Sequence, residues 1–312
     1  MQDNARKITY GAMMIALFAI MLAVSLYVPL LGSIAMLFIP LPIILYRLRY
    51  DRTSSLLVTA TGIVLSLLIG GIILVPVAFL YGLLGFVIGE TVKTGKTKLY
   101  TLMATGLTLL ITTMTMYVAS VFLFGINVID EFFKVIDKAR EQMTSYMEKF
   151  GGLPKDYDKM LDAQIELYQT TIPSMFIIAV FILAFIYVAL NLEVTRRLGN
   201  KVQKFPPFRE MKLPMMTVIL YGIVLLLTLF VAPEPGTSFY LISINATMIL
   251  RFLFLLQGIS LVHHFMHVMK LPKALTVVST VFALLLSPIT TMLGILDTGT
   301  SIRAWIRKDK AK

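Results

Sequence analysis

The sequence predicts an all-α membrane protein, a polytopic bundle of eight or nine transmembrane helices with an amphipathic helical hairpin outside the membrane. Composition is the first reason, since the 312 residues are 58% hydrophobic and only 14% charged, with a mean hydropathy of +0.85. Length is the second, because the apolar stretches approach the roughly 20 residues that a helix needs to cross a bilayer. The third is that lysine and arginine gather in the short loops between these stretches.

The charge distribution indicates topology. The formal net charge is +11, but the cations lie in loops beside apolar stretches. This is the positive-inside pattern and not the footprint of a nucleic-acid-binding domain. We therefore expect membrane lipid as a partner, no nucleic acid, and a retained first span with the N-terminus in the cytoplasm. The chain has no cysteine, which excludes disulfides and thiol chemistry.

The first segment, residues 1–124, is expected to form an N-terminal membrane bundle. Its spans are expected at residues 8–28, 32–46, 54–70, from the Gly70–Gly71 turn to about 91, and 99–124. The second of these is short and contains Pro40 and Pro42, so it is expected to be kinked or broken. The cytoplasmic turns are marked by Arg47, Arg49 and Arg52 and by Lys93, Lys96 and Lys98.

Three of these spans carry rows of small residues at helical spacing. The rows are Ala12, Ala16, Ala19 and Ala23 in the first span; Ser55, Thr59, Gly62 and Ser66 in the third; and Ala78, Gly82, Gly85 and Gly89 in the fourth. Small side chains let helix backbones approach closely, which is a main source of association in lipid. Such a row either packs the helices of one bundle or docks a partner subunit. We assign helix packing to the last two rows and make the alanine row the candidate docking face.

Residues 125–172 differ from the spans and are predicted to form an extracytoplasmic helical hairpin. Apolar side chains recur at helical spacing before and after the Gly151–Gly152–Leu153–Pro154 break, opposite charges of both signs. Nine acidic residues outnumber six basic ones, which is compatible with the outer side of the membrane. We expect the hairpin to lie on the membrane surface or to cap the bundle; binding of an outside partner is the alternative.

The third segment, residues 173–312, is expected to return to the membrane and to end in a basic tail. Spans are expected at 173–192, 214–232 and 239–264, and the loop between the first two is the most basic in the chain, which makes it cytoplasmic. The last apolar stretch, 274–296, leaves two topologies open. A full crossing would put the tail outside, whereas a break at Pro288 would make the stretch re-entrant and keep the tail inside.

Arg251 is the charged residue nearest the middle of an expected span. A charge at that depth costs a few kcal/mol, so we expect it to face a partner acid, backbone carbonyls or a wet cavity. Glu90 and Asp297 are the candidate ion-pair partners. A structural ion pair and contact with an anionic substrate are both open.

A polar stripe follows Arg251 on the same span, formed by Gln257, Ser260, His264 and His267. Gln257 and His264 join Arg251 as candidate substrate-binding residues. His263 and His267 have the i, i+4 spacing of a chelating pair, but no carboxylate or cysteine lies nearby in the sequence to complete a site. We therefore expect interfacial histidines and no metal.

The motifs of common enzyme classes are absent from the sequence. It contains no H-E-x-x-H, no G-x-S-x-G and no Walker-type glycine loop. We expect no enzymatic activity, no catalytic residues and no cofactor. An energised transporter would need an ATPase from another chain.

Residues 8–91 resemble the N-terminal half of the substrate-binding S-components of energy-coupling-factor vitamin transporters. The shared features are the alanine-rich first helix, a short second segment with Pro40 and Pro42, a small-residue third helix and a glycine-rich fourth. In that family the first helix docks on a transmembrane coupling subunit that works with ATPases. The resemblance implies this docking role for Ala12, Ala16, Ala19 and Ala23.

Other residues carry a resemblance that runs through the whole chain. They are Leu256-Gln257-Gly258, then Val262-His263-His264-Phe265, and the ending Leu293-Gly294-Ile295-Leu296-Asp297 with Arg303 after it. With these motifs the chain is similar to the YybS-type family of uncharacterised bacterial multi-pass membrane proteins. This resemblance implies a bacterial plasma-membrane location and no established activity.

Two functions follow as expectations. The first is a small-molecule-binding membrane protein that acts like a transport subunit, with a ligand among the first six spans and contacts from Arg251 and Gln257. The second is a scaffold or regulator whose outer hairpin and basic loop engage envelope proteins or lipid without any substrate. An intramembrane enzyme that uses the histidines and Asp297 is a third hypothesis.

Overall fold

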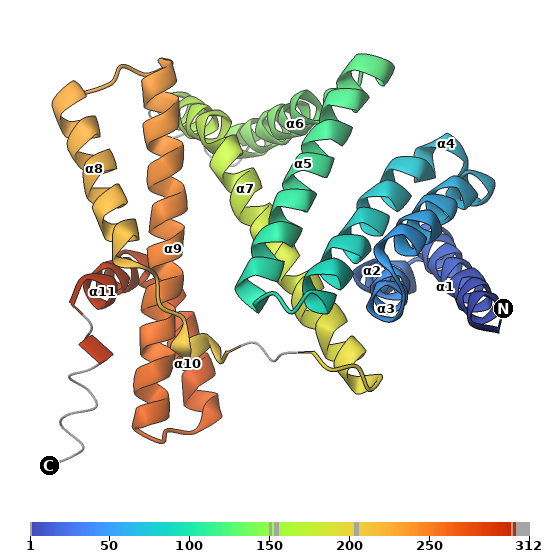
Figure 1. Ribbon diagram of the computed structural model, residues 1–312. Coiled ribbons are helices and arrows are strands. Elements are labelled where there is room, and N and C mark those ends of the chain that lie inside the picture. The colour runs from blue at the N-terminus through green and yellow to red at the C-terminus, as the bar shows by residue number, and fades with distance from the viewer. Residues whose placement is uncertain (1, 150–151, 153–155, 203–205, 301, 304–312) are drawn as a thin grey trace, which may run out of the picture. The chain divides into compact units, whose positions relative to one another are not determined.

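Every regular element that the structure describes is a helix, in agreement with the predicted all-α class (Figure 1). The computed structural model describes the chain except for residues 1, 150–151, 153–155, 203–205, 301 and 304–312. The helices are α1 (Gln2–Tyr27), α2 (Leu31–Phe38), α3 (Leu41–Arg49), α4 (Arg52–Lys93), α5 (Lys98–Phe124), α6 (Val128–Lys149), α7 (Tyr157–Arg197), the 3-10 turn η1 (Phe208–Glu210), α8 (Met215–Val231), α9 (Ser238–Val268), α10 (Lys273–Leu285) and α11 (Ser287–Thr300).

The chain forms two compact units. Unit 1 consists of residues 1–155 and 179–205, and unit 2 consists of residues 156–178 and 206–312. One boundary between the units falls within α7, which runs without a break from Tyr157 through Pro173 to Arg197. Each unit is described by itself.

Unit 1 is built around a hairpin within α4. Gly70 and Gly71 depart from helical geometry, with φ/ψ of −136°/18° and 64°/−160°. The second pair is essentially restricted to glycine, because a Cβ atom would clash there. The expected turn at these two glycines is therefore present, and it divides α4 into a first arm, residues 52–69, and a second arm, residues 72–93.

Small residues bring the two arms together. A Cβ atom at Gly82 would lie 2.9 Å from Thr59 Cγ2 of the first arm, so any larger residue would force this side chain or the arm to shift. The third-span row is buried along its whole length, and so is the fourth-span row. Both rows thus lie inside unit 1, where close backbone contact replaces the hydrophobic drive that lipid does not supply.

The broken segment α2–α3 packs on the second arm. The break expected at Pro40 is present, because α2 ends at Phe38 and α3 begins at Leu41. A Cβ atom at Gly85 would lie 2.6 Å from the Pro40 carbonyl oxygen, and one at Gly89 would lie 2.8 Å from Arg47 Cβ. The glycine row therefore lets the α2–α3 break lie directly against the second arm.

The end of α7 completes unit 1. The phenol oxygens of Tyr187 on α7 and Tyr81 on α4 are hydrogen-bonded at 3.1 Å. Asn191 is fully buried and donates to the carbonyl of Leu37, beside the α2–α3 break, at 2.8 Å. This amide satisfies a backbone acceptor where regular helix ends, as a non-aqueous interior requires.

Unit 2 is organised by the crossing of α9 and α11. A methyl group at Gly258 would overlap the carbonyl oxygen of Thr290, and one at Gly294 would overlap that of Phe254. Before the crossing, α10 and α11 meet at Leu286 with a bend of 103°. A break near Pro288, one of the two alternatives left open, is thus present two residues earlier, with the proline in the first turn of α11, where its missing N–H costs little.

Among the residues that the structure describes, six helices are long and apolar enough to cross a membrane, and the bent α10–α11 pair would make seven. The sequence predicted eight or nine spans. Two features account for the difference, because α4 counts once despite its two arms and α8 has only 17 residues. The multi-spanning helical fold is confirmed, and the number of crossings stays a prediction.

Candidate functional site

A buried polar network lies at the α9–α11 crossing in unit 2. Asp297 on α11 is fully buried, and its Oδ2 atom accepts a hydrogen bond from Gln257 Nε2 at 2.5 Å. The same oxygen pairs with Arg303, whose Nη2 and Nε atoms lie 2.8 and 2.9 Å away. Charge-assisted bonds of this kind offset part of the cost of burying the carboxylate.

The loop before α8 joins the network. Arg303 Nη1 donates to the carbonyl of Arg209 at 2.8 Å, and Nη2 donates to Ser260 Oγ at 3.1 Å. Two further bonds run from Ser260 Oγ to Phe208 O (2.8 Å) and from Leu213 N to Gln257 Oε1 (3.0 Å). The network, defined as Gln257, Ser260, Asp297 and Arg303 with the backbone of residues 208–213, thus ties α9, α11 and the loop together.

Gln257, a candidate substrate-binding residue, has no polar atom left for a ligand. Both polar atoms of Gln257 are bonded within the protein, so this residue would reach a ligand only by releasing Asp297 or Leu213. Asp297 Oδ1 is buried and has no hydrogen-bond partner among the described residues. The network therefore fits a structural role in holding α9, α11 and the loop together, with Asp297 Oδ1 as an acceptor that is not used.

Arg251 is separate from this network. Its side chain is exposed on unit 2, and Nε donates to the Tyr221 hydroxyl of α8 at 3.2 Å. Within unit 2, Arg251 does not pair with Asp297, and in unit 1 Glu90 pairs with another arginine. Asp297 holds Arg303, and Glu90 holds Arg47.

The Arg47–Glu90 pair lies inside unit 1. Arg47 Nε is 2.6 Å from Glu90 Oε2, and the arginine side chain is 7% exposed against 24% for the glutamate. Nη1 of Arg47 also donates to the carbonyl of Tyr50 at 2.9 Å, and Lys93 Nζ reaches the same oxygen at 2.5 Å. These contacts fix the end of α3 against the end of α4.

The histidines take separate positions on α9. His263 Nε2 is 2.7 Å from Thr280 Oγ1 of α10, and its ring meets Phe208 edge to face. His264 is half-buried, and His267 is exposed. Within the described residues, no group of three or more histidine, aspartate or glutamate side chains gathers as metal ligands.

The alanine row of α1 lies on the outside of unit 1. Ala12 and Ala16 are exposed, and Ala19 and Ala23 are partly exposed. The opposite face of α1 is the buried one, because Met14, Phe18 and Leu22 are 5%, 0% and 0% exposed. Phe18 occupies the space left by Gly62, where a Cβ atom would lie 3.0 Å from its ring.

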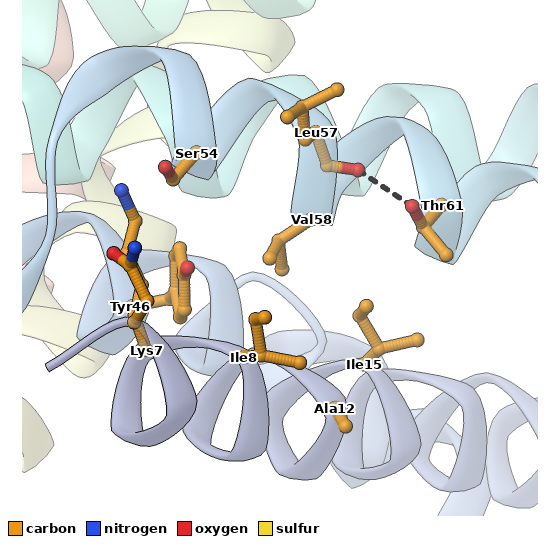
Figure 2. A pocket seen from close by; sticks show the side chains of 11 residues that line it. Lys7, Ile8, Ala12, Ile15, Tyr46, Ser54, Leu57, Val58 and Thr61 are labelled. Carbon is orange, nitrogen blue, oxygen red and sulfur yellow. Dashed lines mark hydrogen bonds between the residues drawn. The ribbon is translucent and has the colours of Figure 1, made fainter. Parts of the chain in front are cut away.

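A groove of about 440 Å³ runs beside this row, between α1 and the first arm of α4 (Figure 2). Ile8 and Ile15 of α1 and Val58 of α4 point into it. Its polar residues are Asn4, Lys7, Tyr46, Ser54 and Thr61, and Gly11, Ala12 and Leu57 complete the lining. Thr61 donates to the carbonyl of Leu57 at 2.8 Å, so its hydroxyl is satisfied within α4.

Two features of these sites were not predicted from the sequence. Arg47 was read only as a topology signal, although it is buried and paired with Glu90. Asn191 was not singled out, although an asparagine within an apolar span is itself a signal of a buried polar contact.

Comparison with known proteins places the chain in a family. A family model described as "Predicted membrane protein (DUF2232)" matches residues 16–298. The chain belongs to this family. It is also similar to "Uncharacterized protein YybS" of Bacillus subtilis (strain 168), with 28% identity over 306 residues that cover 96% of this chain and 98% of the relative. No solved structure matches the chain.

Membership of the DUF2232 family agrees with the YybS-type resemblance and extends over almost the whole chain. It establishes a multi-spanning membrane protein of an uncharacterised family. The likeness of residues 8–91 to S-components is not shown by these comparisons and enters only as a proposal.

Proposed function

We propose that this protein is a non-enzymatic subunit of a membrane complex and that it docks a transmembrane partner through the alanine row of α1. The observation that carries the proposal is the contrast among the three small-residue rows of unit 1. Two rows are buried against their own unit, whereas the alanine row faces outward. In the proposed orientation the protein lies in the bacterial plasma membrane with its N-terminus in the cytoplasm.

The physical argument concerns what a row of small residues does in lipid. Such a row stabilises only when another backbone approaches it closely, because lipid offers no hydrophobic drive for helix association. The bulky face of α1 already supplies its packing within unit 1 through Met14, Phe18 and Leu22. The alanine row of α1 is therefore free to receive a helix of another chain.

The S-component resemblance suggests the kind of partner. In this form of the proposal, the partner is a transmembrane coupling subunit that works with ATPases, and this protein supplies ligand binding. A scaffold that holds other envelope proteins uses the same face without any ligand. Both forms require a partner helix on α1.

Purification from the native membrane in a gentle detergent tests the proposal. Proteins recovered with the tagged wild type are identified by mass spectrometry, and the measurement is repeated for Ala16→Leu. The matched control is Ala60→Leu, which makes the same change at an exposed alanine of α4 outside the row. We expect Ala16→Leu to reduce recovery of the partner at least about tenfold, as lost close packing of a small-residue interface implies.

The outcomes separate the forms of the proposal. Recovery of a coupling subunit and ATPases that depends on Ala16 supports a transport subunit, and recovery of other envelope proteins that depends on Ala16 supports a scaffold. Equal recovery from wild type and Ala16→Leu overturns docking on this face.

Arg251 supports ligand binding as a second candidate function. It is exposed on unit 2 within a candidate span, and it donates a hydrogen bond to a neutral phenol, the Tyr221 hydroxyl. A guanidinium in that position favours a negatively charged group, such as an anionic ligand. Replacement by Gln should abolish binding of an anionic ligand and leave the thermal unfolding temperature nearly unchanged, whereas an arginine with only a structural role would lower that temperature.

A further inference from the structure

The loop before α8 marks one side of unit 2. Ser260 Oγ of α9 lies 2.8 and 3.1 Å from the carbonyl oxygens of Phe208 and Met211 in this loop. The loop therefore lies against the C-terminal half of α9. At their other ends, α8 and α9 are joined by residues 232–237 (Figure 1). Helix α8 thus begins, and helix α9 ends, on the side of this loop.

Helix α10 starts on the same side. From Ser260, α9 continues to Val268, which adds about 12 Å of helix in the direction away from residues 232–237. The chain then turns and runs back along α9 as α10, since His263 Nε2 of α9 lies 2.7 Å from Thr280 Oγ1 of α10. The first end of the α10–α11 pair is therefore on the side of the loop.

The other end of the pair returns to the loop. Helix α10 has 13 residues, so it extends about 20 Å and falls short of a hydrocarbon core of about 30 Å. At Leu286 the chain bends by 103° into α11. After α11, Arg303 donates to the carbonyl of Arg209 in the loop at 2.8 Å and to Ser260 Oγ at 3.1 Å. Arg303 thus lies on the side from which α10 started.

The bend between α10 and α11 is suited to apolar surroundings. Thr290 Oγ1 of α11 donates to the Ala283 carbonyl of α10 at 2.7 Å, and the threonine is 3% exposed. A side chain thus satisfies a backbone acceptor where α10 ends, as a broken helix within a membrane requires. The side chains at the apex of the bend are large, apolar and exposed, namely Leu284, Leu285, Leu286 and Ile289. Such side chains favour contact with lipid chains over contact with water.

We propose that α10 and α11 form a re-entrant hairpin, which enters the membrane from the side of the loop, contacts lipid chains at its apex (residues 284–289) and returns to the same side. The positive-inside rule makes this side cytoplasmic, because the loop is the most basic in the chain. The same rule fits the sequence after Arg303, which carries cations at Arg307, Lys308, Lys310 and Lys312. A full crossing would place these cations outside.

Single-cysteine labelling measures the side of the membrane on which the chain continues after α11. The chain has no cysteine, so Lys310→Cys, Lys270→Cys and Glu234→Cys each carry one thiol. Lys270 follows α9, Glu234 lies between α8 and α9, and both are exposed. With a membrane-impermeant maleimide, applied to intact cells and then to inverted vesicles, we expect Lys310→Cys to react from the same side as Lys270→Cys. Reaction from the side of Glu234→Cys would overturn the proposal.

Spin labelling measures what surrounds the apex. A nitroxide is attached to Leu285→Cys or Ile289→Cys in the full chain, reconstituted in liposomes, and is exposed to oxygen, which concentrates in lipid, or to a water-soluble nickel complex. The matched controls are Ile111→Cys, 63% exposed in the middle of the candidate span α5, and Lys270→Cys in the turn after α9. We expect oxygen to relax both apex labels as it relaxes the label at Ile111→Cys, with little effect of the nickel complex.

The other outcomes contradict the hairpin in different ways. Strong relaxation by the nickel complex, as at Lys270→Cys, would place the apex in water and overturn the proposal. Weak relaxation by both reagents would show that a protein chain covers the apex, which would overturn its contact with lipid. The hairpin lies in unit 2 and does not rest on the proposed docking through α1, so these results leave the test at Ala16 unaffected.

Discussion

The two units differ in how their helices approach each other closely and in where their buried charged residues lie. In unit 1, the hairpin of α4 and the α2–α3 break meet through rows of small residues, and the ion pair Arg47–Glu90 lies beside the end of the glycine row. In unit 2, the Gly258–Gly294 crossing of α9 and α11 is adjacent to the buried polar network. The helices of unit 1 pack through small residues along whole rows, whereas those of unit 2 pack at a single crossing with charged residues beside it.

This difference teaches what each kind of contact costs to disturb. A row spreads its close contacts over four residues and several helical turns. A substitution at one position therefore disturbs the packing of one turn and leaves the others in contact. A crossing concentrates its close contacts at two glycines, and the buried carboxylate of Asp297 lies next to it. We therefore expect unit 2 to respond more strongly to single substitutions than unit 1 does.

The largest effect is expected from Gly294→Leu. The new side chain would overlap the carbonyl of Phe254, which is backbone and cannot move without displacing α9. We expect loss of the folded protein, measured as aggregation in size-exclusion chromatography after detergent extraction. Gly222→Leu is the control, because a Cβ atom there meets nothing within 4 Å.

The same substitution, glycine to alanine, can be compared in the fourth-span row of unit 1 and at the α9–α11 crossing of unit 2. Gly82→Ala in unit 1 would meet a methyl group, Thr59 Cγ2, at 2.9 Å, whereas Gly294→Ala in unit 2 would overlap a backbone oxygen. The unit 1 variant should stay folded with a lower unfolding temperature. A Gly294→Ala variant that is as stable as Gly82→Ala would contradict the distinction between row and crossing.

A smaller but still large effect is expected from Asp297→Ala. Removal of the acid leaves the Arg303 side chain, 13% exposed, without its counter-charge. Breaking one partner of a buried pair costs about 3–5 kcal/mol, whereas replacing both by apolar residues is often neutral. The free energy of unfolding, measured by denaturant titration in detergent, should fall by that amount in Asp297→Ala.

The double variant Asp297→Leu, Arg303→Met separates charge burial from packing. It should recover much of the stability that Asp297→Ala loses, because no unpaired charge is left in the crossing. A double variant that is no more stable than the single one would show that the hydrogen bonds to Ser260 and to the Arg209 carbonyl matter more than the charge balance.

Much of the fold could be predicted because hydropathy and glycine spacing act locally. The turn at Gly70–Gly71 and the break at Pro40 follow from the conformational limits of glycine and proline and from the length of an apolar stretch. The bend near Pro288 was one of two alternatives, which the conflict between a full crossing and the basic tail left open. Each of these depends on a few neighbouring residues.

The pairing of charges could not be predicted in the same way. Arg251, Glu90 and Asp297 were grouped because each is a charge in or near an expected span, and depth along a helix was the criterion. The structure pairs Glu90 with Arg47 and Asp297 with Arg303 instead. Which face of a helix meets which neighbour depends on rotation and on crossings such as Gly258–Gly294, and a single sequence does not encode these in any local pattern.

The smallest effect is expected at the exposed contact between α1 and the start of α4. The hydrogen bond from Lys7 lowers the pKa of the Asp51 carboxyl well below its usual range, and the backbone N–H of Ser54 adds to this. Because the pKa is depressed in the folded state, this contact stabilises above the unfolded-state pKa of about 3.9 and loses its effect as the pH falls through the folded-state value. The unfolding temperatures of wild type and Asp51→Asn should therefore differ by the same small amount from pH 7 to about pH 5 and converge below about pH 4.

A difference that disappears already between pH 7 and pH 5 would show that another group controls the contact. Ser54→Ala, which keeps the carboxylate and removes a neighbouring hydroxyl, should leave this pH profile in place.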